Sequence, residues 1–301
     1  MRRDDELVLE RGAIVPASVA RVDPRDALVV GGFGLIETLA VVDGVPMLLP
    51  EHLARLERSE RELGVRPVPS ERVEATVREF LAAAAVRDAG LRIVRALEAE
   101  ASPSALRMDL RPLPEPPSGG LRLTVERGGL AEPSGADHLK HTGRLAKRVL
   151  ADRARALGAD AALLVDGAGR VLEATHANAV LAFGGRRVTP ALGLGVIPGV
   201  VRGVLLASGA VEEARVELGE LPGLEEACLA NSLLGCCPVR SIDGVAPRLP
   251  GPLGALPGAL WAVLVDREPG LARLRPGPDR PGALRPSPDR PRDPGDVGPI
   301  T

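Results

Sequence analysis

A chain of 301 residues is long enough for two domains, each able to bury its own core. Its net charge of −2 and pI near 6.2 argue against nucleic acid or an anionic membrane as partner, because both require a basic surface. No apolar run has transmembrane length and the N-terminus lacks a signal-peptide core, so we expect a cytoplasmic protein.

The sequence predicts no metal site. Cys228, Cys236 and Cys237 are an odd number without CxxC spacing, which favours neither zinc nor a disulfide framework. We therefore expect the three cysteines to be small buried hydrophobic residues. No metal-ligand spacing connects His52 with His176, and we interpret both as structural hydrogen-bonding residues.

The first part of the chain predicts strands and two helices. ETLAVVDGVPMLL, residues 37–49, is β-branched and apolar on both sides of Asp43-Gly44, a dipeptide that favours a type I′ hairpin. The other elements expected here are a helix over 51–64 with a stripe of Leu53, Leu56 and Leu63 and a glycine stop, a helix over 70–88 opened by a capping Ser70 and stopped at Gly90, and strands over 91–100 and 105–113.

Residues 111–120, RPLPEPPSGG, have the composition of an exposed interdomain linker. They separate a predicted domain over 1–110 from a second over 121–268. The repeats RPGPDRP and RPSPDRP lack apolar residues to bury, so we expect a disordered tail over 269–301. The second domain should contain a strand over 121–127, a helix over 142–157, a hairpin over 161–174, a sheet segment over 178–190, a short helix with Pro198 near its first turn, a strand over 213–218 and further strands within 227–244.

Six motifs follow one another from about Gly31 to Gly244: GFGLIETLAVVDG (32–44), EHLARL (51–56), LKHTGRL (139–145), LEATHAN (172–178), GVIPGVVR (195–202) and ANSLLGCCPVRSIDG (230–244). In this order they resemble the class IV (fold-type IV) pyridoxal-phosphate (PLP) enzymes. That family includes branched-chain and D-amino-acid aminotransferases and 4-amino-4-deoxychorismate lyase. The resemblance implies a two-domain α/β (α+β) fold, with a small N-terminal α/β domain and a larger C-terminal pseudo-barrel domain. It also implies a homodimer and a small-molecule amine substrate.

The same resemblance assigns roles to residues. Lys140 falls on the lysine that forms a Schiff base with PLP, Arg55 on the arginine that binds its phosphate, and Glu173 on the glutamate beside the pyridine nitrogen. Asn231 and Ser232 fall in the C-terminal loop of the site, where the Ser232 hydroxyl could add a contact.

The chemistry of these residue types agrees with the assigned roles. A Schiff base needs an unprotonated amine, so the lysine pKa must fall well below about 10.4. The candidates for the cationic surroundings that lower it are His138, His141 and Arg144. A phosphate fits helix N-terminal amides together with a forked cation, which Val200, Val201 and Arg55 offer.

Two reactions share their first steps: the substrate amine displaces Lys140, and the freed lysine removes the proton from the amine-bearing carbon. A lyase then expels enolpyruvate, whereas an aminotransferase exchanges the amine for a ketone. Lys140-His141 followed by Arg144-Leu145, and Asn231-Ser232-Leu233 followed by Pro238-Val239-Arg240, are nearer the lyase pattern. Thr38 falls where lyases place a threonine facing the cofactor, and its hydroxyl could relay a proton to the departing enolpyruvate. The sequence therefore predicts a 4-amino-4-deoxychorismate lyase.

The sequence departs from the lyase pattern at Gly143, where the family has asparagine, and at Ile36, where it has an aromatic residue. Arg144 and Arg240 are the candidates for binding substrate carboxylates. A D-amino-acid or branched-chain aminotransferase, and a cofactor-binding paralogue without turnover, remain the alternatives.

Overall fold

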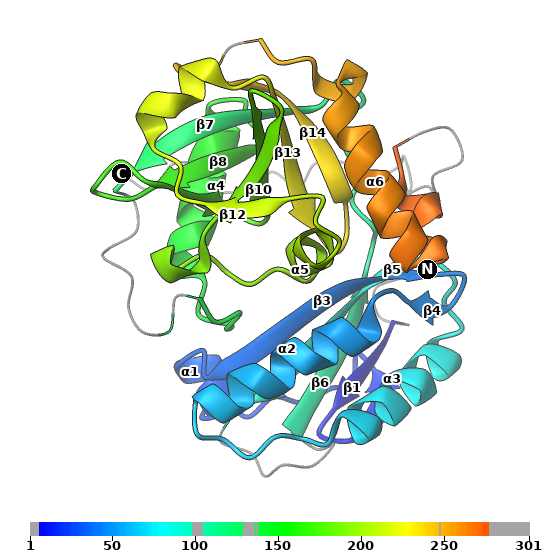
Figure 1. The fold of residues 1–301 in the computed structure, drawn as a ribbon. Helices are drawn as coiled ribbons and strands as arrows, with labels where there is room; N and C mark the ends of the chain where they lie inside the picture. Colours follow the sequence, from blue (N-terminus) through cyan, green and yellow to red (C-terminus); the bar gives the residue numbers. More distant parts are fainter. Residues whose placement is uncertain (1–5, 98–104, 129–135, 137, 247, 277–301) are drawn as a thin grey trace, which may run out of the picture.

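The computed structural model describes residues 6–97, 105–128, 136, 138–246 and 248–276 (Figure 1). The first half of the chain contains β1 (Leu7–Glu10), β2 (Ala13–Pro16), α1 (Ala27–Val30), β3 (Gly34–Val42), β4 (Val45–Pro46), α2 (Leu49–Glu62), α3 (Ser70–Ala84), β5 (Ala89–Ala96) and β6 (Leu106–Arg111).

The second half contains β7 (Leu121–Arg127), α4 (Leu145–Ala156), β8 (Ala161–Val165), β9 (Val171–Ala174), β10 (Asn178–Phe183), β11 (Arg186–Pro190), η3 (Leu192–Leu194), α5 (Val200–Ala207), β12 (Glu212–Ala214), η4 (Leu218–Gly223), β13 (Glu226–Asn231), β14 (Gly235–Ile242), η5 (Gly251–Leu253), α6 (Ala255–Arg267) and η6 (Pro269–Leu274). None of the described helices is both long and apolar enough to cross a membrane.

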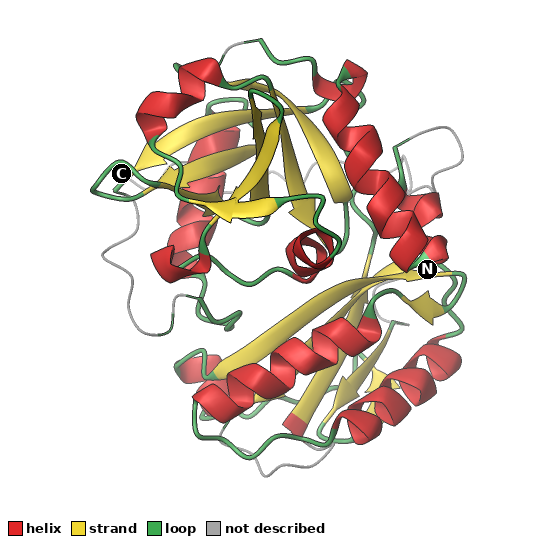
Figure 2. Ribbon diagram, viewed as in Figure 1, coloured by secondary structure: helices red, strands yellow, loops and turns green. Residues whose placement is uncertain are grey.

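The strands form two sheets, one in each half. The order is β2-β1-β6-β5-β3-β4 in the first and β12-β11-β10-β13-β14-β7-β8-β9 in the second. Helices α2 and α3 cover one face of the first sheet, and α5 lies where the two halves meet (Figures 1 and 2). The mixed α/β architecture expected from the sequence, with a smaller N-terminal and a larger C-terminal half, is therefore confirmed.

Strand β3 contributes side chains to the hydrophobic cores of both halves of the molecule. Its hairpin with β4 turns at Asp43 and Gly44, whose φ values of 51° and 80° are those that a type I′ turn requires. Because side chains alternate along a strand, Leu39 packs with α2 and α3, whereas Ala40 and Val42 join the core of the C-terminal half. The two halves therefore share part of a hydrophobic core along β3.

The two N-terminal helices agree with expectation only in part. Helix α2 ends before Gly64 (φ 68°) as predicted, but Leu63 is exposed and lies outside the buried stripe. Helix α3 ends at Ala84 instead of continuing to Asp88, because Ala89 and Gly90 already pair with β3. Ser70 is its first residue rather than its cap, and no side chain caps this end.

In the C-terminal half, α4 begins at Leu145, three residues later than predicted. The preceding segment is held in extended form, because the Thr142 amide donates a 2.8 Å hydrogen bond to the Gly34 carbonyl. Pro198 directly precedes the N-cap Gly199 of α5 and so lies near the first turn, as predicted. The three cysteines are free and buried, as expected.

The prediction that a disordered tail starts at residue 269 is wrong. Leu271 and Leu274 of η6 are buried in the core cluster that contains α6, so this short helix belongs to the folded part. Residues 277–301 lie outside the described residues. Within the predicted exposed linker, Leu113 is also buried in that cluster.

Candidate active site

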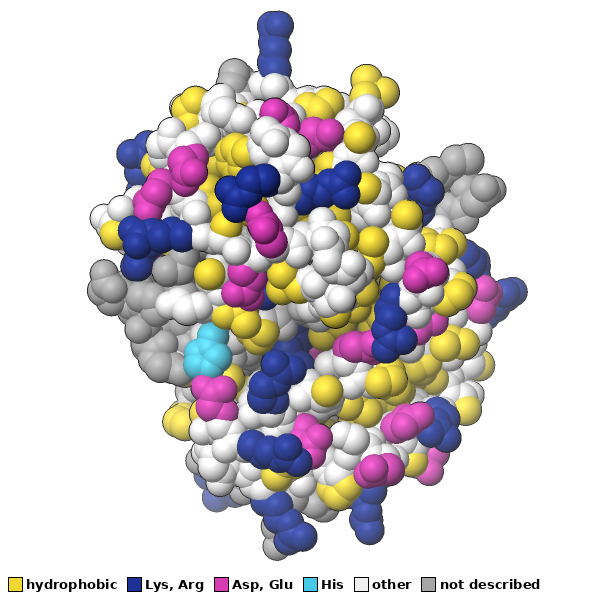
Figure 3. Space-filling model, viewed as in Figure 1, with side chains coloured by type: hydrophobic (Ala, Val, Ile, Leu, Met, Phe, Trp, Pro, Cys, Tyr) yellow, Lys and Arg dark blue, Asp and Glu magenta, His cyan; other side chains and the backbone are white. Residues whose placement is uncertain are grey.

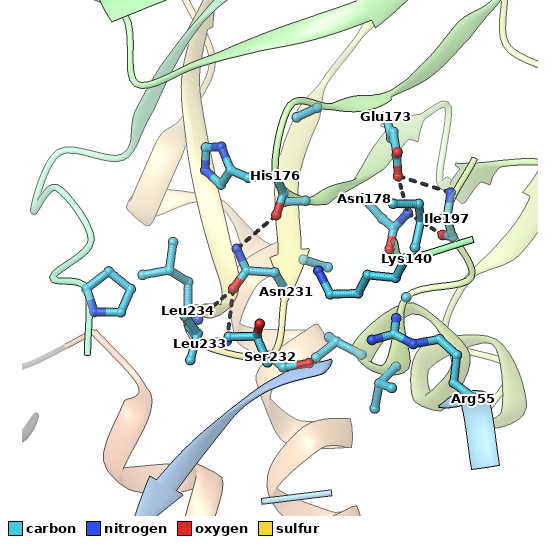
Figure 4. Close-up of a pocket in the computed structure, with 18 of the residues that line it drawn as sticks. Arg55, Lys140, Glu173, His176, Asn178, Ile197, Asn231, Ser232, Leu233 and Leu234 are labelled. Carbon is cyan, nitrogen blue, oxygen red and sulfur yellow. Dashed lines mark hydrogen bonds between the residues drawn. The ribbon is translucent and has the colours of Figure 1, made fainter. Parts of the chain in front are cut away.

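A cavity of about 300 Å³ has walls from both halves of the chain (Figure 4). This volume lies at the lower end of the about 300–1,000 Å³ typical of small-molecule and cofactor pockets. The structure brings all eight site residues proposed from the sequence to this one cavity: Thr38, Arg55, Lys140, Glu173, Val200, Val201, Asn231 and Ser232.

Lys140 lies in the segment that precedes α4. Hydrogen bonds hold the backbone of this segment against the N-terminal half. Its carbonyl accepts a 2.8 Å hydrogen bond from the Ile36 amide. The Thr142 hydroxyl donates to the Gly32 carbonyl at 2.5 Å. These contacts fix the backbone of Lys140 against the start of β3, while its side chain lines the cavity.

The surroundings of Lys140 lower its pKa to about 7. Burial is the largest cause, followed by the charges of Arg144 and Arg55; Glu37 and Glu173 act in the opposite direction. A substantial share of the amine is therefore uncharged and nucleophilic near neutral pH. His138, which we expected to contribute, is paired with Glu62 at 2.5 Å instead.

Arg55 is oriented by a buried carboxylate that the sequence analysis did not propose as a site residue. Its Nε and Nη2 donate to Glu37 at 2.9 and 2.5 Å, and His52 lies 2.5 Å from the same carboxylate. Burial alone would raise the pKa of Glu37, but the charges of Arg55 and His52 lower it to about 2. The remaining Nη1 donates to the Pro198 carbonyl at 3.1 Å, which directs Arg55 towards the start of α5.

The N-terminus of α5 is a second anion-binding feature. Its N-cap is Gly199, so no side chain caps the first turn, whose amides include those of Val200 and Val201. Free helix N-terminal amides and the helix dipole favour a phosphate. A Cβ at Gly199 would lie 1.9 Å from the Asn178 side-chain oxygen, so only glycine permits this close packing.

Glu173 is buried on β9 and held by three donors. One oxygen accepts from the Asn178 side-chain amide at 3.0 Å and from the Ile197 amide at 3.3 Å. The other oxygen accepts from the Lys147 ammonium of α4. Figure 4 shows Glu173 and Arg55 on opposite sides of Lys140. The carboxylate is thus fixed at the end of the cavity away from Arg55.

The loop between β13 and β14 closes another side of the cavity. Asn231 accepts hydrogen bonds from the amides of Leu233 and Leu234 at 3.0 and 2.8 Å, so its side-chain oxygen shapes the loop. Ser232 lies within this loop and lines the cavity. Arg240 is exposed on β14 and does not line the cavity, so the suggestion that it contacts substrate there is wrong.

Four residues contribute to the site without having been predicted from the sequence: Glu37, Arg111, Lys147 and Asn178. One signal in the sequence could have found Lys147. The chain has 38 Lys and Arg residues, of which only Lys140 and Lys147 are lysine. Arginine stays protonated and cannot act as an amine nucleophile. Each lysine in such an arginine-rich chain is therefore a candidate for a site that needs an amine. Both belong to this site.

Together these groups can hold a phosphate ester near Arg55 and α5, a reactive carbonyl near Lys140 and a protonated ring nitrogen at Glu173. Residues 34–242 match the family model described as amino-transferase class IV.

Two relatives and one solved structure illustrate the likeness. Branched-chain-amino-acid aminotransferase-like protein 2 of Arabidopsis thaliana is 26% identical over 251 residues, covering 77% of this chain but only 45% of that protein. Aminodeoxychorismate lyase of Bacillus subtilis is 26% identical over 264 residues, covering 79% of this chain and 87% of that protein. A branched-chain aminotransferase from Thermoproteus uzoniensis, solved with norvaline, has a TM-score of 0.74 at 22% identity, covering 89% and 97% of the respective chains. The structural likeness confirms the predicted fold.

Proposed function

The chain belongs to the amino-transferase class IV family of PLP-dependent enzymes, and from this premise we propose that it is a 4-amino-4-deoxychorismate lyase. The reaction releases pyruvate and leaves 4-aminobenzoate, a folate precursor. The observation that carries the proposal is the placement of Lys140, with a pKa of about 7, in one cavity with Glu173 and a free helix N-terminus.

The donor set of the cavity fits PLP. Arg55 and the first-turn amides of α5 would hold the phosphate, Lys140 the aldehyde carbon and Glu173 the pyridine nitrogen. Ser232 would add a hydroxyl, and Asn231 would keep its loop in place. When bound, the cofactor supplies an aldehyde that condenses with amines and a ring that withdraws electrons from the amine-bearing carbon.

The residues of the chain move or hold protons at defined atoms. With the cofactor bound, Lys140 Nζ would take the proton from the amine-bearing carbon of the substrate, a role that needs a pKa close to working pH. Glu173, fixed by Asn178 and the Ile197 amide, holds the proton on the ring nitrogen. The Thr38 hydroxyl would relay a proton to the departing enolpyruvate, giving up its own proton as it receives the one that Lys140 has taken.

Three observations favour elimination. Thr38 lies on the face of β3 that lines the cavity, where a hydroxyl can reach the leaving group. The lysine segment, Lys140-His141 followed by Arg144-Leu145, resembles that of the lyases, and a curated lyase from B. subtilis is among the relatives. Loss of enolpyruvate leaves an aromatic ring, which makes the elimination favourable.

The second candidate is an aminotransferase for branched-chain or D-amino acids. It is favoured by the Arabidopsis relative and by the Thermoproteus structure. Both reactions use the same lysine and glutamate, so the fate of the substrate distinguishes them.

We also propose that the enzyme is a homodimer. Val30, Phe33 and Leu145 are large apolar residues with more than half of their surface exposed. Phe33 and Leu145 flank a contact in which a Cβ at Gly32 would lie 3.1 Å from the Gly143 Cα. We call these three residues the apolar patch; a second copy of the chain would cover it.

The test is turnover of 4-amino-4-deoxychorismate by the PLP-loaded enzyme without any oxo acid. We expect equal amounts of pyruvate, measured with lactate dehydrogenase, and 4-aminobenzoate, measured by chromatography. Amine transfer from D-alanine or leucine to 2-oxoglutarate, without pyruvate release from aminodeoxychorismate, would establish the aminotransferase instead. A protein that takes up no PLP would contradict both.

A further inference from the structure

The charges in the cavity wall do not balance. The wall carries the cations Arg55, Arg111, Lys140 and Arg144 but, among the carboxylates of the described residues, only Glu173. Figure 3 shows basic side chains around the hollow between the two halves. Which of these cations already has an acidic partner decides what else the cavity can bind.

Two of the charges are already matched. Arg55 forms a two-pronged pair with Glu37 behind the wall, and Glu173 is paired with Lys147 of α4. Within the described part of the chain, neither Arg111 nor Arg144 has a side-chain hydrogen bond or an ion pair. Two guanidinium groups of the cavity are therefore free to bind anions.

The side chain of Arg111 packs in the cavity wall and does not extend into solvent. It ends β6, opposite Gly90 of β5, and a Cβ at Gly90 would lie 2.8 Å from its Cγ. Leu233 of the β13–β14 loop approaches the same point. The Nε of Arg111 is buried without a hydrogen-bond partner among the described residues. Leaving such a donor unsatisfied costs free energy, which an anion in the cavity would recover.

Arg144 reaches the cavity from a different element. It is the N-cap residue of α4, four positions after Lys140, and its side chain lines the cavity. Neither arginine is needed for the phosphate, because Arg55 and the α5 amides already provide that site. Two separate cations beside the reactive amine thus remain for the substrate.

We propose that Arg111 and Arg144 each bind one carboxylate, so that the preferred substrates are small amines bearing two carboxylates. A guanidinium recognises a carboxylate through two parallel hydrogen bonds, which fixes orientation as well as position. The inference rests on the proposed function and narrows it: aminodeoxychorismate carries two carboxylates, as does glutamate, whereas leucine and D-alanine carry one.

The test measures ligand binding as well as turnover. Straight-chain dicarboxylates from succinate to pimelate, and monocarboxylates of matched length, are titrated by calorimetry into PLP-loaded and PLP-free protein. We expect the best dicarboxylate to bind at least about tenfold more tightly than its monocarboxylate match. Arg111→Gln should lose roughly 10–100-fold in dicarboxylate affinity, the range for a lost hydrogen bond to a charged group.

Arg144→Gln should cause a similar loss and serves as the second variant if Arg111→Gln does not fold. The control is Arg78→Gln, because Arg78 lies on α3, is paired with Glu74 and is not part of the cavity wall. It should bind both series as the wild type does.

Retention of the full dicarboxylate preference by Arg111→Gln would overturn the proposal. So would loss of PLP from that variant, because Arg111 would then serve the cofactor. If the wild type failed to release pyruvate but kept an Arg111-dependent preference for dicarboxylates, the lyase assignment would fail and this inference would stand.

Discussion

At the scale of single residues, the site depends on what surrounds Lys140. Burial and the nearby arginines hold its pKa at about 7, so the reactive neutral amine becomes more abundant as the pH rises through that value. This explains how an ordinary surface-type side chain can serve as a nucleophile. The sequence identified Lys140 by its motif, but it could not show that Arg55, 85 positions earlier in the chain, contributes to its pKa.

The first prediction concerns pH. The rate at which PLP attaches to the apo-protein, followed by visible absorbance, should rise with pH around a midpoint near 7. Arg144→Gln removes a cation that lowers the pKa of Lys140, so the midpoint should move to higher pH. Arg148→Gln, on the exposed side of α4 and paired with Asp152, should leave it in place. A midpoint that moves to lower pH in Arg144→Gln would contradict this account.

The second prediction concerns Thr38. Thr38→Val keeps the shape of the side chain but removes the hydroxyl proposed to protonate the leaving group. PLP uptake should be unchanged, while pyruvate release should fall by roughly 10²–10⁴-fold, the usual contribution of a general acid. A variant that releases pyruvate at the wild-type rate would remove Thr38 from the mechanism.

At the scale of helices and strands, the sequence correctly predicted the turns and helix ends that depend only on neighbouring residues. The β3–β4 turn at Asp43-Gly44 and the end of α2 before Gly64 follow from residues that tolerate positive φ. The start of α4 does not follow from local residues, because Thr142 in the preceding segment donates hydrogen bonds to Gly32 and Gly34, more than 100 positions away. Arg111 was missed for the same reason: only the folded sheet shows that the last residue of a strand faces the cavity.

The third prediction tests the start of α5. Gly199→Ala places a Cβ 1.9 Å from the Asn178 oxygen and should displace the side chain that holds Glu173. We expect PLP affinity, measured by absorbance titration, to fall at least about tenfold, a cost of about 1.4 kcal/mol. Gly203→Ala on the same helix meets no atom within 4 Å and is the matched control. Equal PLP affinities in the two variants would show that the close packing at Gly199 is unimportant.

At the scale of the whole molecule, the sequence predicted the family fold and eight of the residues that line the cavity, but not how the two halves join. The linker predicted over residues 111–120 implied two separate domains. In the structure, Ala40 and Val42 of β3 pack in the same cluster as Leu113, Trp261 and η6. These contacts link parts of the chain up to 234 positions apart, so no local pattern reveals them. They hold the two walls of the cavity together.

The fourth prediction concerns the assembly. In sedimentation or light scattering, the wild type should have twice the chain mass of 31.3 kDa. Phe33→Asp combined with Leu145→Asp introduces charge into the apolar patch and should shift the protein to the mass of one chain. Leu253→Asp, at a residue that is 94% exposed elsewhere on the surface, should remain dimeric. A monomeric wild type would refute the dimer.

The most direct test of the central claim is to reduce the PLP-loaded protein with borohydride, digest it and locate the phosphopyridoxyl group by mass spectrometry. The chain offers only two lysines, Lys140 and Lys147, and both lie at the site. The label should be on Lys140 alone and should be absent from Lys140→Arg. A label on Lys147, or on neither lysine, would contradict the account.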